Sequence, residues 1–364
     1  MKKLDILEAI RGGTALYVFL GHFIIGSFIG NTNPFSIFLR FGQEAVILFF
    51  LMSGFVIQLS YKKKQIPFLK YLKKRFFRIY PLFLISILLV LCYRLLIGLP
   101  IETKTLFGNL FMLQDMGSLK PGTIVDTFGN SALWSLSYEW WFYMLFIPIS
   151  SFKNKNTVAI IIVVLSALVY FIYPIQLFRW PMYFGIWWSG VVLADLYLNK
   201  ELSFKNILKK IICPFLLLPS LFLIFTSLTK PFDSVGVHPL LEIRHFGSAI
   251  IFIVIAVVWK NFNWIGFPFF KPLEKIAPFS YGLYVLHLPL IMIINPIISY
   301  YIANSYAQFI IIAFLIILIS LLLETKFQNK INSLVFKRNN LSHKKQTLVG
   351  SNPAKLIKTR TIEK

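Results

Sequence analysis

The sequence predicts an all-α protein, a polytopic transmembrane helical bundle of about ten spans. Hydrophobic residues make up 57% of the 364 positions and the mean hydropathy is +0.72, which exceeds what a water-soluble domain of this size needs to bury. Apolar stretches long enough to cross a bilayer core, which takes about 20 helical residues, recur along the chain. These stretches are continuous rather than alternating, so the pattern favours helices over a transmembrane β-barrel.

Ten apolar segments follow one another along the chain. The expected spans are residues 12–30, 42–60, 79–98, 132–150, 157–174, 179–198, 211–228, 246–259, 278–296 and 307–323. The first resembles a signal peptide, but it is long, lacks a small-residue cleavage site and carries His22, so we expect a retained helix. We expect a membrane domain over residues 1–325 and a basic, frayed cytoplasmic tail over 326–364.

The basic residues predict the orientation of the bundle. Ten spans place both termini on one side, and 30 of the 37 Lys and Arg residues fall in the segments of that side. Cytoplasmic loops carry such an excess, so both termini are expected in the cytoplasm. The segregation accounts for the net charge of +23 without a nucleic-acid partner. Cys92 and Cys213 lie in or beside apolar segments, so no disulfide framework is expected.

Two loops on the opposite, outer side are long, at residues 99–131 and 229–245. The first is expected to be ordered, with a short helix near residues 105–113.

Two ionisable residues fall at similar depth inside the membrane. His22 lies eleven residues after Arg11, which on a helix is roughly 16 Å. Glu139 lies in a span that runs inward from the outer surface, at a depth close to that of His22. Buried ionisable groups of this kind usually mark function. A carboxylate beside an imidazole suits a general base, so we predict that the two pair. The alternatives are a structural histidine, and a Glu139 that meets Arg179 or a cation of an outer loop.

The first basic loop predicts an anion site. Arg75 and Arg78 are three residues apart and share a helical face. With Arg11 at the same surface they form a candidate cluster for phosphates, which the planar guanidinium binds well. The alternative is anchoring to anionic lipid, to which we assign Lys62–Lys64.

A third candidate is His287, which falls mid-membrane two residues before Pro289. A structural role, in which His287 hydrogen-bonds a backbone group left without a partner by Pro289, explains this position at least as well as a catalytic role. The five histidines and two cysteines show no metal-ligand spacing. No phosphate-binding glycine loop and no nucleophile elbow is present.

Six short blocks are specific as an ordered set, although any one alone is weak. They are Leu4-Asp5 with Ile10-Arg11-Gly12 and His22, then residues 49–55, 75–81, 134–139, 179–185 and 280–287. In these blocks, from residue 4 to 289, the chain resembles the acyltransferase-3 family of integral membrane acyltransferases, whose motif separates an arginine and a histidine by ten residues. The chain departs from the family pattern in Gly13-Thr14, where Ile-Ala is more usual, and in Tyr138 and Trp140, which flank Glu139.

The resemblance implies transfer of an acyl group, usually acetyl, from cytoplasmic acyl-CoA to a hydroxyl of an exported or lipid-linked saccharide at the plasma membrane. It implies acetyl-CoA as a donor substrate and no permanently bound cofactor. The residues expected to act are His22 and Glu139 in catalysis, Arg11, Arg75 and Arg78 in donor binding, and Trp134, Arg179 and His287 in acceptor binding. The histidine either deprotonates the acceptor or carries the acyl group transiently; both routes remain open.

A transporter or flippase for a glycan or small anion is the alternative function, because buried charges suit it equally well. It requires movement of substrate and no acyl-CoA. The sequence shows no paired inverted segments with matching Gly/Pro breaks, which disfavours it. A purely structural scaffold leaves the buried charges unexplained. Membrane lipids surround the protein in each case.

Overall fold

The computed structural model describes residues 3–30, 33–229, 236–263 and 265–336. These residues form helices and loops, with one isolated β-bridge between Gln114 and Val125. The predicted all-α class is therefore confirmed.

Ten helices of twelve or more residues carry the architecture. They are α1 (Lys3–Ile24), α2 (Gly42–Lys63), α3 (Phe68–Leu96), α5 (Trp134–Ser150), α6 (Lys155–Ile172), α7 (Gln176–Leu198), α9 (Leu218–Thr229), α10 (Leu240–Asn261), α12 (Ser280–Tyr301) and α13 (Ser305–Leu322). The shorter helices are α4 (Thr103–Leu110), α8 (Phe204–Ile207) and α11 (Phe267–Phe270). The 3-10 segments are Pro34–Leu39, Ser131–Leu133, Lys271–Lys275 and Ala277–Phe279, and the π-helical segments are Ile25–Ile29, Leu208–Leu217 and Leu323–Phe327.

Each of the ten expected spans is helical, and eight of the described helical segments are long and apolar enough to cross a membrane. The other two are α5, which has only 17 residues, and α7. Protein surrounds α7 on most sides, so this helix needs no continuous apolar face toward lipid. The molecule is thus a multi-pass membrane protein.

Three expected boundaries shift. The first helix begins at Lys3 rather than near residue 12, and the short helix expected near 105–113 is α4. The last helical segment continues to Phe336, so the expected frayed tail begins as helix. Residues 337–364 of that tail lie outside the described part of the chain.

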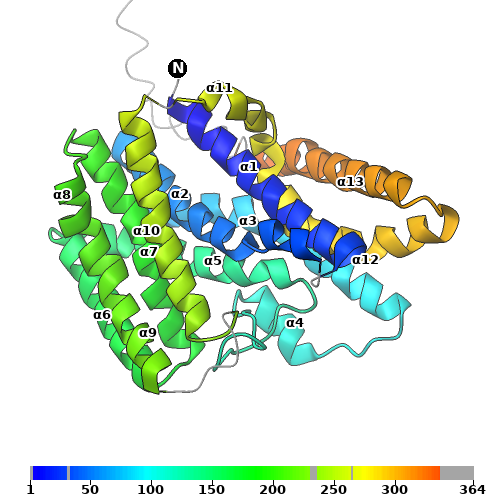
Figure 1. Ribbon diagram of the computed structural model, residues 1–364, viewed down its shortest axis with the longest axis horizontal. Coiled ribbons are helices and arrows are strands. Elements are labelled where there is room, and N and C mark those ends of the chain that lie inside the picture. The colour runs from blue at the N-terminus through cyan, green and yellow to red at the C-terminus, as the bar shows by residue number, and fades with distance from the viewer. Residues whose placement is uncertain (1–2, 31–32, 230–235, 264, 337–364) are drawn as a thin grey trace, which may run out of the picture.

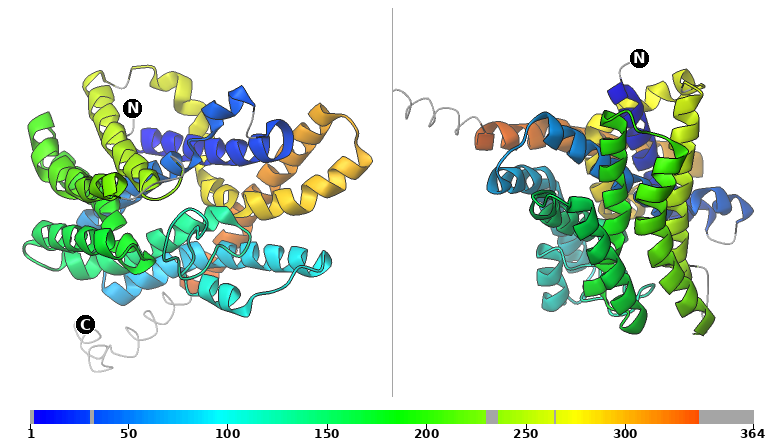
Figure 2. Two further views of the ribbon diagram at one scale, coloured as in Figure 1. Left: turned by 60° about the horizontal axis from the view of Figure 1, so that its bottom comes forward. Right: turned by 90° about the vertical axis from the view of Figure 1, so that its left-hand side faces the viewer.

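The helices gather in two groups. In one, α7 packs against α2 and α6, with α9 and α10 beside them; in the other, α12 packs against α1, α3 and α13 (Figure 1). Both groups remain distinct when the molecule is turned (Figure 2). Helix α2 contacts α7 and also α1, and so joins the groups.

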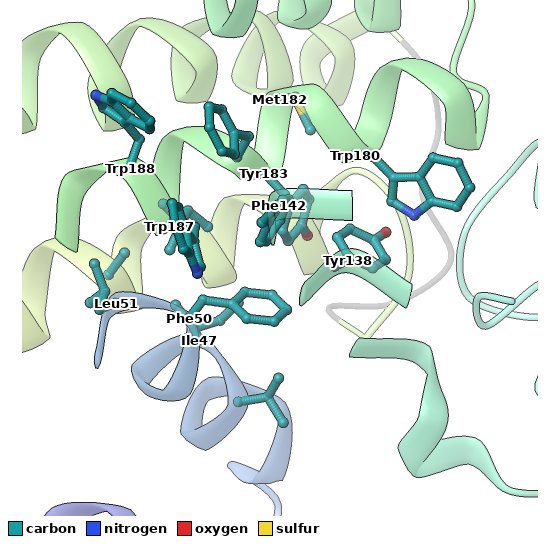
Figure 3. Packing of buried hydrophobic residues seen from close by; sticks show 14 of the residues in the cluster. Ile47, Phe50, Leu51, Tyr138, Phe142, Trp180, Met182, Tyr183, Trp187 and Trp188 are labelled. Carbon is teal, nitrogen blue, oxygen red and sulfur yellow. The ribbon is translucent and has the colours of Figure 1, made fainter. Parts of the chain in front are cut away.

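Aromatic side chains fill the first group. Trp187 of α7 lies near Phe142 of α5, and Phe142 in turn contacts Phe50 of α2 (Figure 3). Such rings bury large apolar areas at ring–ring distances of about 5–7 Å, which favour edge and offset contacts. This packing fixes α5 against α2, and therefore fixes the face of α5 that carries Glu139.

Candidate active site

One cavity of about 200 Å³ lies between the two helix groups. Arg11 of α1 and Arg75 and Arg78 of α3 all line it, together with residues of α2, α5 and α12. The predicted convergence of the three arginines is therefore confirmed. Two of them come from one helical face and the third from a separate helix, and the packing of both α1 and α3 against α12 brings the three together.

The arginines differ in their partners. The Arg78 guanidinium forms a 2.7 Å ion pair with Glu324, whose side chain is almost fully buried. Glu324 also accepts the backbone N–H of Gly282 at 2.6 Å. Arg11 donates from Nη2 to the Ala277 carbonyl at 3.0 Å. These contacts fix the position of Arg11 and neutralise much of the charge of Arg78.

Arg75 is held by aromatic faces instead of a carboxylate. Its guanidinium lies 5.1 Å from the ring centre of Tyr71 and 5.2 Å from that of Tyr143, within the range of a cation–π contact. The buried Nε atoms of Arg75 and Arg11 have no hydrogen-bond partner among the described residues. Both residues line the cavity, and guanidinium groups at a cavity are suited to an anionic ligand.

Glu139 has other neighbours than the sequence analysis predicted. Its carboxylate accepts hydrogen bonds from Ser53, at 2.8 Å, and from Tyr143, and it lines the arginine cavity. The predicted pairing with His22 is wrong, and so is the alternative pairing with Arg179. Equal depth in the membrane does not decide which way a helix faces, and α5 turns Glu139 toward α2.

His22 pairs with His287 of α12. The His287 Nε2 and His22 Nδ1 atoms are 3.1 Å apart, and the ring centres are 5.1 Å apart. His22 is exposed, whereas His287 is fully buried. The Tyr284 ring, which lines the cavity, lies 6.2 Å from the His287 ring. The histidine pair therefore lies about one helical turn beyond this part of the cavity wall.

The expected acceptor contacts Trp134, Arg179 and His287 are 3%, 0% and 0% exposed. They offer no surface to a substrate, so the structure does not support that role. Sequence position alone could not reveal burial at these points, because the loop of residues 111–130 covers Trp134 and Arg179.

Arg179 and Trp134 belong to a buried polar network under that loop. Arg179 Nη2 forms a 2.9 Å ion pair with Asp115 Oδ2, and Tyr138 donates to the same oxygen at 2.6 Å. Lys120 Nζ lies 3.1 Å from Asp115 Oδ1 and 3.8 Å from the centre of the Trp134 ring. This network ties the loop to α5 and α7.

The pKa values of the two loop residues of the network, Asp115 and Lys120, are both lowered. Burial opposes ionisation of Asp115, but Lys120 and Arg179 beside it outweigh burial and lower the pKa of its carboxyl. Burial also lowers the pKa of Lys120 to about 8, although Asp115 opposes the shift. Asp115 is thus the carboxylate that is paired directly with two buried cations.

Sequence reasoning missed several residues of both clusters. They are Ser53, Tyr143, Tyr284 and Glu324 at the cavity and histidine pair, and Asp115, Lys120 and Tyr138 under the loop. Ser53, Tyr138 and Tyr284 lie inside blocks that the sequence analysis had already singled out. Glu324 carried one usable signal, since it is an acidic residue at the end of a strongly apolar span.

Comparison with known proteins shows which family this chain resembles. A family profile described as "Acyltransferase domain" matches residues 4–325. The O-acetyltransferase OatA of Staphylococcus aureus (strain NCTC 8325 / PS 47) is 26% identical over 343 residues, which cover 85% of this chain and 53% of the relative. The acyltransferase MdmB of Streptomyces mycarofaciens is 31% identical over 156 residues, 40% of this chain and 38% of the relative.

A third relative, protein 2 in the picA locus of Rhizobium radiobacter, is 36% identical over 125 residues, which cover 32% of this chain and 59% of the relative. No solved structure matches. The chain spans about half the length of the OatA proteins. The family profile covers the histidine pair, the arginine cavity and Glu324 alike, and the chain therefore belongs to the acyltransferase domain family.

Proposed function

We propose that this protein is a membrane-embedded O-acyltransferase that moves an acetyl group from cytoplasmic acetyl-CoA to a hydroxyl of an exported or lipid-linked saccharide. One observation carries the proposal: three arginines line a single cavity, and Tyr284 in the wall of that cavity has its ring centre 6.2 Å from that of His287, the partner of His22. Family membership and an O-acetyltransferase relative support the reaction class.

The arginine cavity suits the phosphates of acyl-CoA. Among the described residues Arg75 forms no carboxylate ion pair and rests on the rings of Tyr71 and Tyr143, and Arg11 lines the same cavity. Glu139, at the same cavity, limits the repulsion among the arginines when no donor is bound. Arg11 lies roughly 16 Å from His22 along α1, a separation that the extended pantetheine arm of acyl-CoA is suited to span.

His22 is the group that meets the reacting atoms, because it is exposed while its partner histidine is buried. In direct transfer, the acceptor hydroxyl gives its proton to the His22 imidazole and its oxygen attacks the thioester carbonyl. The C–S bond then breaks and the thiolate takes the proton from the imidazolium. In the covalent route the imidazole nitrogen attacks the thioester carbonyl, the C–S bond breaks and CoA leaves as the thiolate. The acceptor oxygen then attacks the acyl carbon, the C–N bond to the imidazole breaks, and the thiolate takes the hydroxyl proton.

The proposal places the arginines on the cytoplasmic side of the plasma membrane, where acyl-CoA is made. The excess of Lys and Arg on the same side supports this orientation.

Calorimetry of acetyl-CoA with the purified protein in detergent tests the donor site. We expect micromolar binding that Arg75→Gln weakens by about tenfold or more, since a charge-assisted hydrogen bond contributes about 1.5–3 kcal/mol. The matched control is Arg94→Gln near the other end of α3, whose side chain bonds the Pro100 carbonyl, and it should bind normally. Arg78 is a poorer choice for substitution, because its removal leaves the buried Glu324 carboxylate without its ion-pair partner.

Acetyl transfer tests the reaction itself. A folded, membrane-inserted His22→Ala variant should leave the cell-surface glycan unacetylated. Normal acetylation by this variant would contradict the proposed role of His22. A folded wild-type protein that binds neither acetyl-CoA nor longer acyl-CoAs would favour transport instead.

A further inference from the structure

His287 contacts His22 but no substrate surface, and the hydrogen bonds of this pair decide which nitrogen of His22 is free. We propose that His287 is a positioning residue that holds His22 as the Nδ1–H tautomer and leaves Nε2 unprotonated for the reaction. This inference rests on the proposed function of His22, but its spectroscopic test does not.

The first step concerns His287 alone. Its Nδ1 lies 3.0 Å from the Leu283 carbonyl oxygen, one turn earlier in α12. A carbonyl oxygen only accepts hydrogen bonds, so Nδ1 of His287 must carry the proton. Two lone pairs would otherwise face each other at hydrogen-bonding distance.

The second step concerns the charge of the pair. His287 is fully buried, and no carboxylate among the described residues is hydrogen-bonded or ion-paired to either ring. A buried cation without a partner is costly, so His287 is neutral. Because its one proton is on Nδ1, its Nε2 has only a lone pair.

The third step fixes His22. Its Nδ1 lies 3.1 Å from Nε2 of His287, so Nδ1 of His22 must be the donor. Neutral His22 then has its free lone pair on Nε2, and the exposed position of the side chain leaves that nitrogen open to a substrate.

The arrangement favours catalysis beyond orientation. When Nε2 of His22 takes up the acceptor proton, or an acyl group, the ring becomes cationic. Its Nδ1–H bond to His287 then becomes charge-assisted and stronger. His287 thus has the role that was predicted for the Glu139 carboxylate, which was to orient His22 and stabilise its cationic form. It does so without a buried negative charge.

The spectroscopic test uses the wild-type protein. In detergent, ¹⁵N-histidine labelling distinguishes protonated from unprotonated ring nitrogens, and the His22 signals are identified by their loss in His22→Gln. We expect a protonated Nδ1 and an unprotonated Nε2 at neutral pH. The opposite tautomer would overturn the inference, whatever the protein catalyses.

The kinetic test compares two amides at position 287. In His287→Gln the amide oxygen can take the place of Nε2 and accept from His22, whereas His287→Asn reaches only the Nδ1 position. We expect Gln to keep acetyl transfer within about tenfold of wild type and Asn to lower kcat by about 10²-fold or more, with acetyl-CoA binding unchanged in both. Equal losses in the two variants would indicate a structural role only. A wild-type protein without transferase activity would refute the proposed function and leave the ¹⁵N result to decide the tautomer.

Discussion

Two arginines three residues apart on α3 have different electrostatic surroundings. Arg78 is paired with buried Glu324, so it holds α3 to the helix that follows α13 as well as lining the cavity. Arg75 rests on tyrosine rings, which leave its positive charge available to a ligand. Donor phosphates should therefore depend more on Arg75 and Arg11 than on Arg78.

Asp115 is the carboxylate that both buried cations contact directly in the polar network under the loop of residues 111–130. Asp115→Asn leaves Lys120 and Arg179 buried without their anion, and we expect a loss of about 3–5 kcal/mol of stability. Thermal unfolding in detergent measures the loss. Asp126→Asn in the same loop is the matched control, because Asp126 is exposed and the amide oxygen can still accept the Gly117 N–H. Similar stabilities of the two variants would show that the network contributes little.

At the scale of elements, α2 and α7 approach so closely that each needs a glycine. A Cβ on Gly54 would overlap the Trp187 carbonyl oxygen, and one on Gly190 would overlap the Leu51 carbonyl oxygen. The two glycines thus let the backbones of two helices meet, as small residues do in membrane bundles. This contact sets the position of α2, and with it Ser53, the partner of Glu139.

Gly190→Ala should therefore destabilise the protein by about 1–3 kcal/mol, because a methyl group forces the helices apart. Gly247→Ala in α10 is the control, since an added Cβ there has no neighbour within 4 Å. In an open helical position alanine is favoured over glycine by up to about 1 kcal/mol, so the control should unfold at the same or a higher temperature. A control as unstable as Gly190→Ala would contradict the role of the close approach.

At the scale of the whole molecule, the helices at the periphery of the bundle turn apolar side chains away from the core. Ile161 and Leu165 of α6, Ile251 of α10, and Ile310 and Phe314 of α13 are each more than half exposed. They recur every three or four residues along a helix, as expected of a surface that faces lipid.

The orientation of the molecule is tested by labelling single cysteines in intact cells. In a Cys92→Ser/Cys213→Ser background, Lys104→Cys on α4 should react with a membrane-impermeant maleimide. Lys62→Cys at the end of α2 should react only after permeabilisation. Both lysines are exposed, so access depends on the side of the membrane. The reverse pattern would place the arginine cavity outside the cell and remove it from cytoplasmic acyl-CoA.

The sequence alone determined the helical class, the positions of the ten helices and the presence of Arg75 and Arg78 on one face. These features depend on local properties, because crossing a bilayer requires a long apolar helix whatever its neighbours are. The last helical segment runs to Phe336, eleven residues into the expected tail, because polar residues can still extend a helix beyond its apolar part.

Only the tertiary structure decided which side chains meet. His22 pairs with a residue 265 positions away, Glu139 turns to Ser53, and Arg179 is buried on Asp115. Spacing along a helix gives the depth of a residue, but the rotation of the helix about its axis is set by packing against its neighbours. In this protein that rotation follows from the contacts of α2 with α7 and of α1 with α12, which no single segment encodes.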